Sequence, residues 1–404
     1  MTDRIVVLGG GFAGLWSAVG AARALDELGV GAGRVEVVLI ERTPWHSIRV
    51  RNYEADLRDT RVALDGVLGP IGVRRVEGEV TGLDIGGRTV AYEAGGVASS
   101  MTYDRLVFAL GSRLAHPPIP GLGSHAFDVD TYAAAERLNV HIAGLVQRDP
   151  TPGLSTVLVV GGGLTGIEAA AEMPAKLRAA GIVSPKVILA DHAVRVGSDM
   201  GAGALAVIEE AFSVLGIEAR GGVSVAAVDA EGVTLATGER IAAATVVWCA
   251  GMQAHPLTAQ FPVECDRLGR LPVEPSLKIK GLVAEFAAGD SAWFLVDGVH
   301  SSVMSCQHGR PMGRFAGHNV VCDLLGRPML PLRIDWYTTI LDLGSWGAVY
   351  TEGWDRQLVA RGAAAKRTKE IINRERIYPP RSGDRRQILD AAVPTVQAPP
   401  VRFE

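Results

Sequence analysis

The chain has 404 residues, of which 48% are apolar and 21% charged, and this balance excludes a disordered chain. Its 40 basic and 44 acidic residues give a net charge of −4, so there is no overall basic field that would hold a nucleic acid. The length predicts two to three domains.

The N-terminus leads directly into an apolar, β-branched run at 4–8, without the charged and apolar regions of a cleavable leader. The longest uncharged run, 150–167, is rich in Pro, Gly, Ser and Thr, so we expect no membrane span. The four cysteines lie far apart and no His/Cys cluster has metal-ligand spacing, so we expect neither a disulfide framework nor a metal. These features favour the cytoplasm.

Two segments, 4–18 and 156–170, repeat each other in register. Each consists of a β-branched run, a Gly-x-Gly-x-x-Gly motif and an Ala-rich stretch that favours a helix. The glycines are Gly9, Gly11 and Gly14 in the first copy and Gly161, Gly163 and Gly166 in the second. In order, they allow a tight turn, close approach of a pyrophosphate, and close packing of helix on strand. Each copy therefore predicts a dinucleotide site at a helix N-terminus.

An acidic residue ends the next apolar strand after each motif. Glu41 follows 35–40, and Asp191 follows 186–190. Such an acid accepts hydrogen bonds from ribose hydroxyls and repels a 2′-phosphate, so Asp191 favours NADH over NADPH. A single motif of this kind could be a structural glycine turn that binds no ligand. Two complete copies favour two dinucleotide sites.

The order of the motifs resembles the two-dinucleotide-binding flavoprotein superfamily, which includes pyridine nucleotide-disulfide reductases, ferredoxin reductases and type II NADH dehydrogenases. Further matching segments are 103–112, 246–251 and 285–290. The resemblance implies FAD at the first motif and NADH at the second. The implied FAD contacts are Gly9, Gly11, Phe12, Ala13, Gly14, Glu41, Arg42, Val80, Ala109, Gly111, Asp290 and Gln307. The implied NADH contacts are Gly161, Gly163, Thr165, Gly166, Asp191 and Gly251.

The resemblance also implies an α/β fold with two Rossmann-like, three-layer ββα domains. The NAD domain is inserted in the FAD domain, and a small α+β domain follows. The expected boundaries are 1–121 and 266–327 for the FAD domain, 122–265 for the NAD domain and 328–404 for the C-terminal domain, which acts as a cap or interface and ends in a mobile tail.

Departures from the family pattern narrow the chemistry. The segment 43–53 has no cysteine, which excludes the dithiol chemistry of the disulfide-reductase branch. The segment 303–319 corresponds to the family helix that points at the flavin and starts near Pro311. There Gln307 matches the first Gln of the quinone motif of type II enzymes, whereas Pro311 and Met312 depart from it. Cys306 is either a reactive thiol or a small buried side chain.

Other candidates have two interpretations each. Glu168 lies one turn past the second motif, where it either orients the nicotinamide and handles protons or complements the helix dipole. Four residues after Glu41 are expected over the cofactor or on a solvated surface, and two histidines are expected as proton donors or packing residues. The first group is Trp45, His46, Arg49 and Arg51, and the histidines are His300 and His308.

The C-terminal region predicts two strands within 336–351 and a helix over 356–377. Residues 361–386 hold nine basic and three acidic side chains. The apolar side chains of this helix form only a thin stripe, so a solvated helix or one packed on the chain or an anionic partner is favoured over one at the inner face of the membrane.

We therefore expect an FAD-dependent NADH dehydrogenase that passes electrons to an external small acceptor, either a quinone or another compound. One alternative is a soluble NADH-dependent reductase of a small aromatic or of a ferredoxin-like partner. The alternative from another class is an NADH-sensing flavoprotein resembling apoptosis-inducing factor. The expected catalytic residues are Glu168, Cys306 and Gln307. The sequence leaves open whether the protein forms a homodimer.

Overall fold

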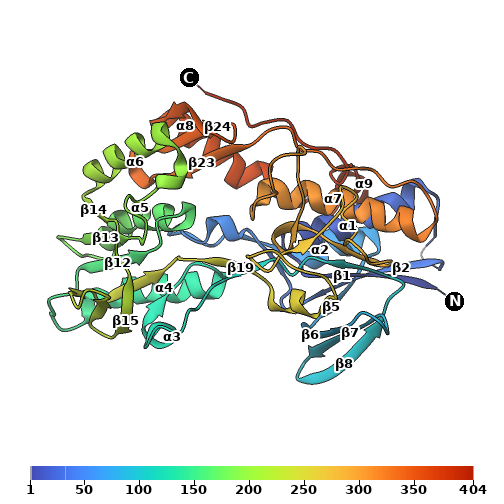
Figure 1. Cartoon of the computed structure of the whole chain (residues 1–404), viewed down its shortest axis with the longest axis horizontal. Helices are drawn as coiled ribbons and strands as arrows, with labels where there is room; N and C mark the ends of the chain where they lie inside the picture. The colour runs from blue at the N-terminus through green and yellow to red at the C-terminus, as the bar shows by residue number, and fades with distance from the viewer. Residues whose placement is uncertain (1, 32, 404) are drawn as a thin grey trace.

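Two parallel sheets lie at opposite ends of the long axis of the molecule, and the C-terminal elements lie across one side of both (Figure 1). The structure is a computed structural model that describes residues 2–31 and 33–403. The expected α/β fold with two Rossmann-like sheets is confirmed.

The first sheet is parallel and has the strand order β21-β9-β1-β2-β5. Its strands are β1 (Asp3–Leu8), β2 (Val35–Glu41), β5 (Arg74–Glu77), β9 (Arg105–Phe108) and β21 (Glu285–Ala287). The side chains at 5–8 are fully buried, as expected for a β-branched strand between two covering layers. Because β21 comes from far along the chain, the second sheet is an insertion in the first.

Helices cover one face of the first sheet and an antiparallel sheet covers the other (Figure 1). The helices are α1 (Phe12–Glu27) and α7 (Cys306–Leu324), and the antiparallel strands are β6 (Glu79–Asp84), β7 (Thr89–Ala94) and β8 (Val97–Thr102). The two helices approach closely because glycines face each other, and a Cβ at Gly317 would lie 2.2 Å from the carbonyl oxygen of Ser17. This contact anchors α7 above the first sheet.

The second sheet repeats this arrangement with the order β11-β18-β12-β13-β14. Its strands are β11 (Ala126–Phe127), β12 (Thr156–Val160), β13 (Lys186–Ala190), β14 (Ile217–Arg220) and β18 (Thr245–Trp248). The associated helices are α4 (Tyr132–Gly144), α5 (Leu164–Ala179) and α6 (Ala202–Leu215), and the antiparallel strands are β15 (Val225–Asp229), β16 (Gly232–Leu235) and β17 (Arg240–Ala242).

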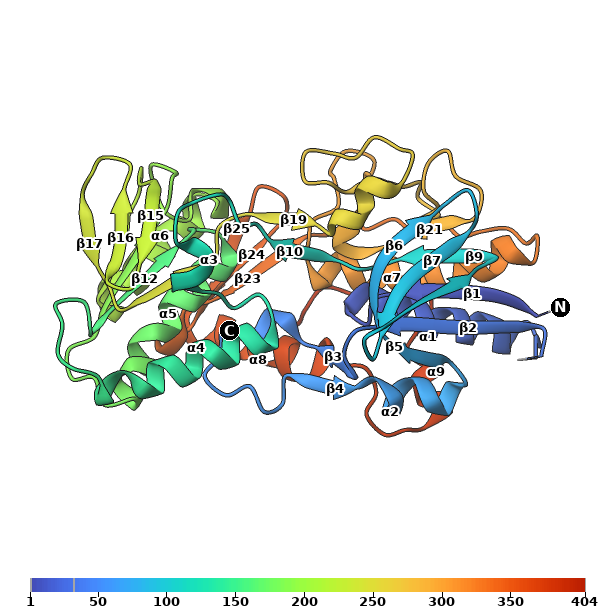
Figure 2. The ribbon, with the colours of Figure 1, turned by 90° about the horizontal axis from the view of Figure 1, so that it is seen from below.

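Two antiparallel strands connect the two halves (Figure 2). They are β10 (Ser112–Leu114) and β19 (Met252–Ala254). The remaining short elements are β3 (Trp45–Ser47), β4 (Arg61–Ala63), α2 (Leu64–Leu68), α3 (Leu122–His125), β20 (Leu271–Pro272) and β22 (Ala292–Trp293). Among the described residues, no helix combines the length and apolarity needed to cross a membrane.

The C-terminal region is a three-stranded antiparallel sheet with a helix packed on it. Its elements are β23 (Thr338–Asp342), β24 (Ala348–Glu352), β25 (Gln357–Arg361), α8 (Gly362–Ile371), the π-helical turn Ile372–Arg376 and α9 (Arg385–Asp390). The two predicted strands are confirmed as β23 and β24. The prediction of a helix from Arg356 is wrong for 357–361, because these residues pair with the free edge of β24 and the helix starts only at Gly362.

The tail after α9, for which mobility stays a prediction, contacts three other parts of the chain. The side-chain oxygen of Gln397 accepts a hydrogen bond from Arg310 at 3.0 Å, and the hydroxyl of Thr368 donates to the carbonyl of Val401 at 3.0 Å. Arg402 pairs with Glu352. The tail therefore crosses the C-terminal sheet and reaches α7.

Candidate functional site

The first glycine loop has the geometry of a pyrophosphate cradle. Gly9 has a φ of +98°, and a Cβ at Gly14 would lie 1.8 Å from the carbonyl oxygen of Gly9. By contrast, a Cβ at Gly11 would meet nothing within 4 Å. Gly11 caps α1 without a side-chain hydrogen bond, so no side chain caps the first turn, which includes Phe12 and Ala13.

The second glycine loop has the same geometry. Gly161 has a φ of +113°, a Cβ at Gly166 would lie 1.7 Å from the carbonyl oxygen of Gly161, and Gly163 faces open space. Gly163 caps α5, which carries Thr165 in its first turn. The structure therefore offers two helix N-termini suited to anions.

The acid after each motif is held against its loop. Glu41 accepts a hydrogen bond from the backbone N–H of Gly10 at 2.7 Å. Asp191 accepts one from the N–H of Gly162 and another from Ala193 at 2.7 Å. Both carboxylates therefore stand beside the place where a ribose would follow the pyrophosphate.

The other residues implied for cofactor binding surround these loops. The carbonyl oxygen of Ala109 would lie 2.5 Å from a Cβ at Gly9, so Ala109 backs the first turn. Gly111 and Gly251 have φ values of +72° and +82°, and they follow β9 and β18 at the carboxyl ends of the two sheets. Val80 is buried on β6. Arg42 lies 4.0 Å from Glu79 on the exposed side of the first loop.

Asp290 lies between the first loop and the start of α7. It follows Gly289, where a Cβ would lie 2.6 Å from the Cβ of Ala13. Asp290 accepts a hydrogen bond from the hydroxyl of Ser112 at 2.6 Å and lies 3.8 Å from Arg49. Desolvation raises the pKa of the carboxyl group. Arg49 also pairs with Asp130, which fixes the guanidinium at this point.

His46 supports the first loop from behind. Its Nδ1 lies 2.8 Å from the carbonyl oxygen of Gly10, and burial lowers its pKa to about 4. The neutral imidazole therefore donates from Nδ1 to that carbonyl. Trp45 lies next to it on β3 and is partly exposed. His46 thus positions the loop rather than lying over the cofactor.

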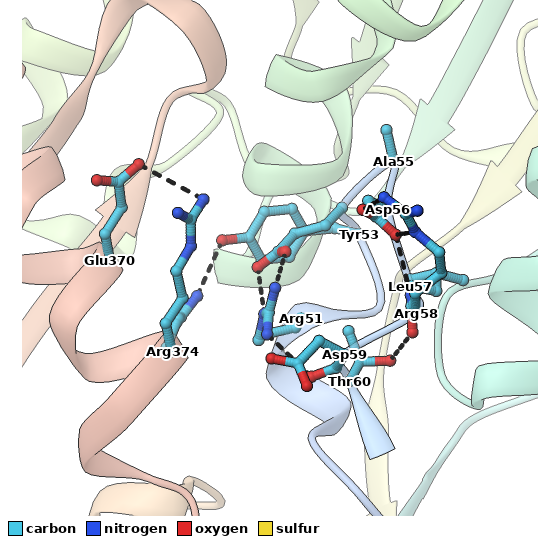
Figure 3. A network of polar contacts seen from close by, with 12 residues as sticks. Arg51, Tyr53, Ala55, Asp56, Leu57, Arg58, Asp59, Thr60, Glu370 and Arg374 are labelled. Atoms are coloured by element: carbon cyan, nitrogen blue, oxygen red, sulfur yellow. Dashed lines mark hydrogen bonds and ion pairs between the residues drawn. The ribbon is translucent and has the colours of Figure 1, made fainter.

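Arg51 and Tyr53 join the segment after β3 to the C-terminal region (Figure 3). Arg51 pairs with Glu54 and donates to the hydroxyl of Tyr378 at 2.6 Å. The hydroxyl of Tyr53 accepts from Asn373 at 3.4 Å. Arg51 is therefore a structural ion-pair residue, because four of its five N–H donors bond within the protein.

The first turn of α7 faces a cavity. The hydroxyl of Ser305 accepts from the N–H of His308 and caps the helix, so the helix begins at Cys306. The expectation that it starts near Pro311 is wrong: the serine cap sets the start one turn earlier and Pro311 lies inside the helix. Desolvation raises the pKa of Cys306, which keeps the thiol protonated at neutral pH.

Gln307 is tied to the C-terminal region. Its Nε2 lies 3.5 Å from the carbonyl oxygen of Trp336, and the hydroxyl of Thr338 donates to its Oε1 at 3.3 Å. These contacts hold the amide at the wall of the cavity, where it can meet a ligand only at one edge.

Glu168 is buried in α5 and forms an ion pair with Lys369 of α8 at 2.7 Å. The same carboxylate oxygen accepts from the N–H of Asp342 at 3.0 Å. Burial raises the pKa of Glu168, whereas Glu168 and Asp342 raise that of Lys369, so the lysine stays charged. Glu168 and Lys369 are 201 residues apart in the sequence. A role of Glu168 in complementing the helix dipole alone does not explain this ion pair.

A cavity of about 270 Å³ brings these groups together. Its lining includes Arg49, Tyr53, Leu164, Thr165, Glu168, Cys306, Gln307, Arg310, Arg314, Trp336, Thr338, Lys369, Arg376 and Gln397. The first turns of α5 and α7 therefore open on the same space, with the C-terminal region as its third wall. Four residues that the sequence singled out as separate candidates, Thr165, Glu168, Cys306 and Gln307, are among this lining.

The two predicted histidines do not line this cavity. His300 pairs with Asp297 at 2.7 Å and stacks on Trp354 at 4.4 Å. The Nδ1 of His308 accepts from the N–H of Val303 at 3.0 Å, and burial lowers its pKa to about 4. Both histidines therefore pack and hydrogen-bond within the protein.

Sequence reasoning missed Lys369, Tyr53 and the arginines of α7. The helical spacing of Gln307, Arg310 and Arg314, at i, i+3 and i+7, was the available signal, since it places all three on one face. Lys369 was noticed only as part of a basic segment. Within the described residues, no cluster of His, Cys, Asp and Glu could hold a metal ion.

Comparisons with known proteins agree with this geometry. The sequence matches the profile of the family described as pyridine nucleotide-disulphide oxidoreductase over residues 3–313. An NADH dehydrogenase-like protein of Mycobacterium tuberculosis is 57% identical over 401 residues, which cover 98% of this chain and 100% of that protein. A type II NADH:quinone oxidoreductase of the same species is 28% identical over 355 residues, or 80% of this chain and 73% of that protein.

Solved structures share the fold. NDH2 from Plasmodium falciparum in complex with NADH has a TM-score of 0.77 at 12% identity and covers 97% of this chain and 97% of its own. The sulfide:quinone oxidoreductase of Aquifex aeolicus has a TM-score of 0.75 at 16% identity, with 95% of this chain and 92% of its own covered.

Proposed function

The chain belongs to the pyridine nucleotide-disulphide oxidoreductase family and is an NAD(P)H oxidoreductase, and we propose that it is an FAD-dependent NADH:quinone oxidoreductase. The observation that carries the proposal is the shared cavity, where the first turns of α5 and α7 meet the C-terminal region. The relative named as a type II NADH:quinone oxidoreductase supports a quinone as acceptor.

The residues of the first half fit FAD. Gly11 leaves open space over the N-terminus of α1, and Glu41 stands beside it. Asp290 lies between this loop and α7, where a carboxylate can accept from the ribityl hydroxyls. When bound, FAD supplies a site that takes a hydride from NADH and passes two electrons to the acceptor.

The residues of the second half fit NADH. Gly163 leaves the N-terminus of α5 open for the pyrophosphate, and Asp191 is held where it can accept from the adenosine ribose. Arg195, a basic side chain four residues after Asp191, pairs with Glu209 at 2.6 Å. This arrangement favours NADH over NADPH.

The acceptor is external to the protein. The segment 43–53 has no cysteine, so the chain lacks the dithiol that the family name mentions. Reduction of a quinone by NADH also consumes one proton from solution, giving NAD⁺ and the hydroquinone. Lys369 holds a proton at Nζ beside Glu168 at the cavity wall. We infer that this pair delivers the proton that the quinone takes up.

Anaerobic stopped-flow spectroscopy tests the proposal. The purified holoprotein is reduced with NADH, followed by the loss of flavin absorbance, and is then mixed with a short-chain quinone. We expect fast reduction and fast recovery of the absorbance. Fast reduction without recovery by quinone contradicts the quinone and points to another small or protein acceptor, and failure with all acceptors points to a sensor.

An Asp191→Ala variant tests the nucleotide assignment. In this variant, the kcat/KM for NADH divided by that for NADPH is expected to fall at least tenfold, since a charge-assisted hydrogen bond to the ribose is worth about 1.5–3 kcal/mol. Glu136→Gln serves as the control, because it removes an exposed carboxylate from α4 of the same half. An unchanged ratio in Asp191→Ala contradicts the ribose role.

A further inference from the structure

Three guanidinium groups at the cavity have no acidic partner among the described residues. Arg310 and Arg314 of α7 are only 6% and 4% exposed, and Arg376 lies opposite them in the C-terminal region. None of the three has a carboxylate within 4.0 Å in residues 2–31 and 33–403. By contrast, the neighbouring Arg374 and Arg381 pair with Glu370 and Asp59.

The contacts that these three side chains do make leave hydrogen-bond donors free. Arg310 and Arg314 stack on the ring of Trp16, with guanidinium carbons 5.5 and 4.5 Å from its centre. Arg310 also donates to Gln397, but the Nε of both arginines has no partner. Arg376 donates only to backbone carbonyls of the tail, at Ala398 and Pro399.

Such a cluster is unfavourable unless an anion joins it. Buried charges are ordinarily paired, and like charges repel each other more strongly where water is excluded. Burial, together with the neighbouring arginines, lowers the pKa of Arg310 to about 9 and that of Arg314 to about 10, so both remain charged at neutral pH. The aromatic ring offsets part of this cost.

The cluster continues the acceptor cavity. Gln307, Arg310 and Arg314 lie along one face of α7, and seven residues span about 10 Å of helix. Beyond the arginines opens a second hollow of about 450 Å³, lined by Trp16, Tyr378, the same three guanidinium groups, Arg374, Arg381 and one carboxylate, that of the exposed Glu375. A ligand whose ring lies at Gln307 therefore reaches the arginines with a substituent.

We propose that Arg310, Arg314 and Arg376 form an anion subsite that binds an acidic group carried by the acceptor, whose aromatic ring lies at Cys306 and Gln307. The forked donors of arginine suit a carboxylate or sulfonate, which can accept two parallel hydrogen bonds. The inference rests on the proposed quinone reduction, and it narrows the acceptor to an acidic aromatic compound.

The first test compares two acceptors that differ in charge, neutral menadione and 1,4-naphthoquinone-2-sulfonate. In Arg310→Gln and Arg314→Gln, the ratio of kcat/KM for the sulfonate over menadione is expected to fall at least tenfold from its wild-type value. The control is Arg386→Gln, which removes a positive charge from the exposed C-terminal surface and should keep the ratio. An unchanged ratio in both cavity variants overturns the proposal.

The second test measures binding without turnover. Calorimetry with naphthalene-2-sulfonate on the oxidised holoprotein should show one site, weakened at least tenfold in Arg310→Gln and Arg314→Gln. Competition with inorganic phosphate shows whether the site binds the acidic group of an aromatic acceptor or any free anion. If phosphate binds as tightly as the sulfonate, the site is a general anion site and the proposal is contradicted. If neither quinone accepts electrons, the proposed function fails, whereas calorimetry still decides the subsite.

Discussion

Gly11 and Gly163 occupy equivalent places, yet they are expected to serve different ligands. Both face open space at a helix N-terminus. We predict that Gly11→Val is purified without flavin, because the side chain fills the pyrophosphate site. Gly163→Val should keep its flavin and lose at least tenfold in NADH affinity. Flavin absorbance and NADH titration check both, and a stoichiometric flavin in Gly11→Val contradicts the assignment.

His46 makes the stability of the protein pH-dependent. Its pKa is about 4 in the folded chain and about 6.5 in the unfolded chain, so between these values the unfolded state binds more protons. Its contribution is complete above pH 6.5 and is lost as the pH falls toward 4. From pH 7 to pH 5, we expect the wild type to lose about 2 kcal/mol more unfolding free energy than His46→Asn.

Urea unfolding at the two pH values measures this loss. The matched control is His125→Asn, which makes the same substitution at an exposed histidine on α3. If wild type and His46→Asn lose the same free energy, the buried neutral imidazole is not responsible.

Residues whose role is local could be predicted from the sequence. Gly9, Gly14 and Glu41 act within one loop and the strand beside it, so their spacing is enough to place them. Lys369 could not be placed in this way, because its partner Glu168 lies 201 residues earlier and only the packing of two helices brings them together.

Two helices from different parts of the chain meet through Glu168 and Lys369. Lys369→Met leaves a buried carboxylate without its counter-charge, and we predict a loss of about 3–5 kcal/mol in unfolding free energy. The double variant Glu168→Gln/Lys369→Met should recover most of this loss, because no unpaired charge remains. Denaturant unfolding of the wild type, the single variants Lys369→Met and Glu168→Gln, and the double variant gives the coupling energy. Additive losses would contradict a direct pair.

Element boundaries were predicted less well where tertiary contacts decide them. The stretch 357–361 continues an apolar pattern compatible with a helix, but the free edge of β24 turns it into β25. The start of α7 depends on the Ser305 side chain, and the proline at 311 was the more conspicuous but weaker signal. The repeated strand–glycine–helix units were predicted because each carries its own constraints.

At the scale of the whole molecule, the internal repeat was enough to predict the two-sheet fold. It was not enough to predict that the C-terminal region closes the cavity. The third wall of the cavity comes from residues 336–340, the segment 369–377 and the tail. These residues carry no motif of their own. Their position depends on how the C-terminal sheet packs on α5 and α6, and on how α9 packs on α1 in the other half (Figure 1).

The late position of β21 and α7 has a consequence for the order in which the protein folds during synthesis. The second sheet draws its strands from residues 126–248 and can close once they have emerged. The first sheet lacks its edge strand until residue 287, and α1 lacks its covering helix until residue 324. The half that leaves the ribosome first is therefore completed last, and its apolar faces stay uncovered for longer than those of its neighbour.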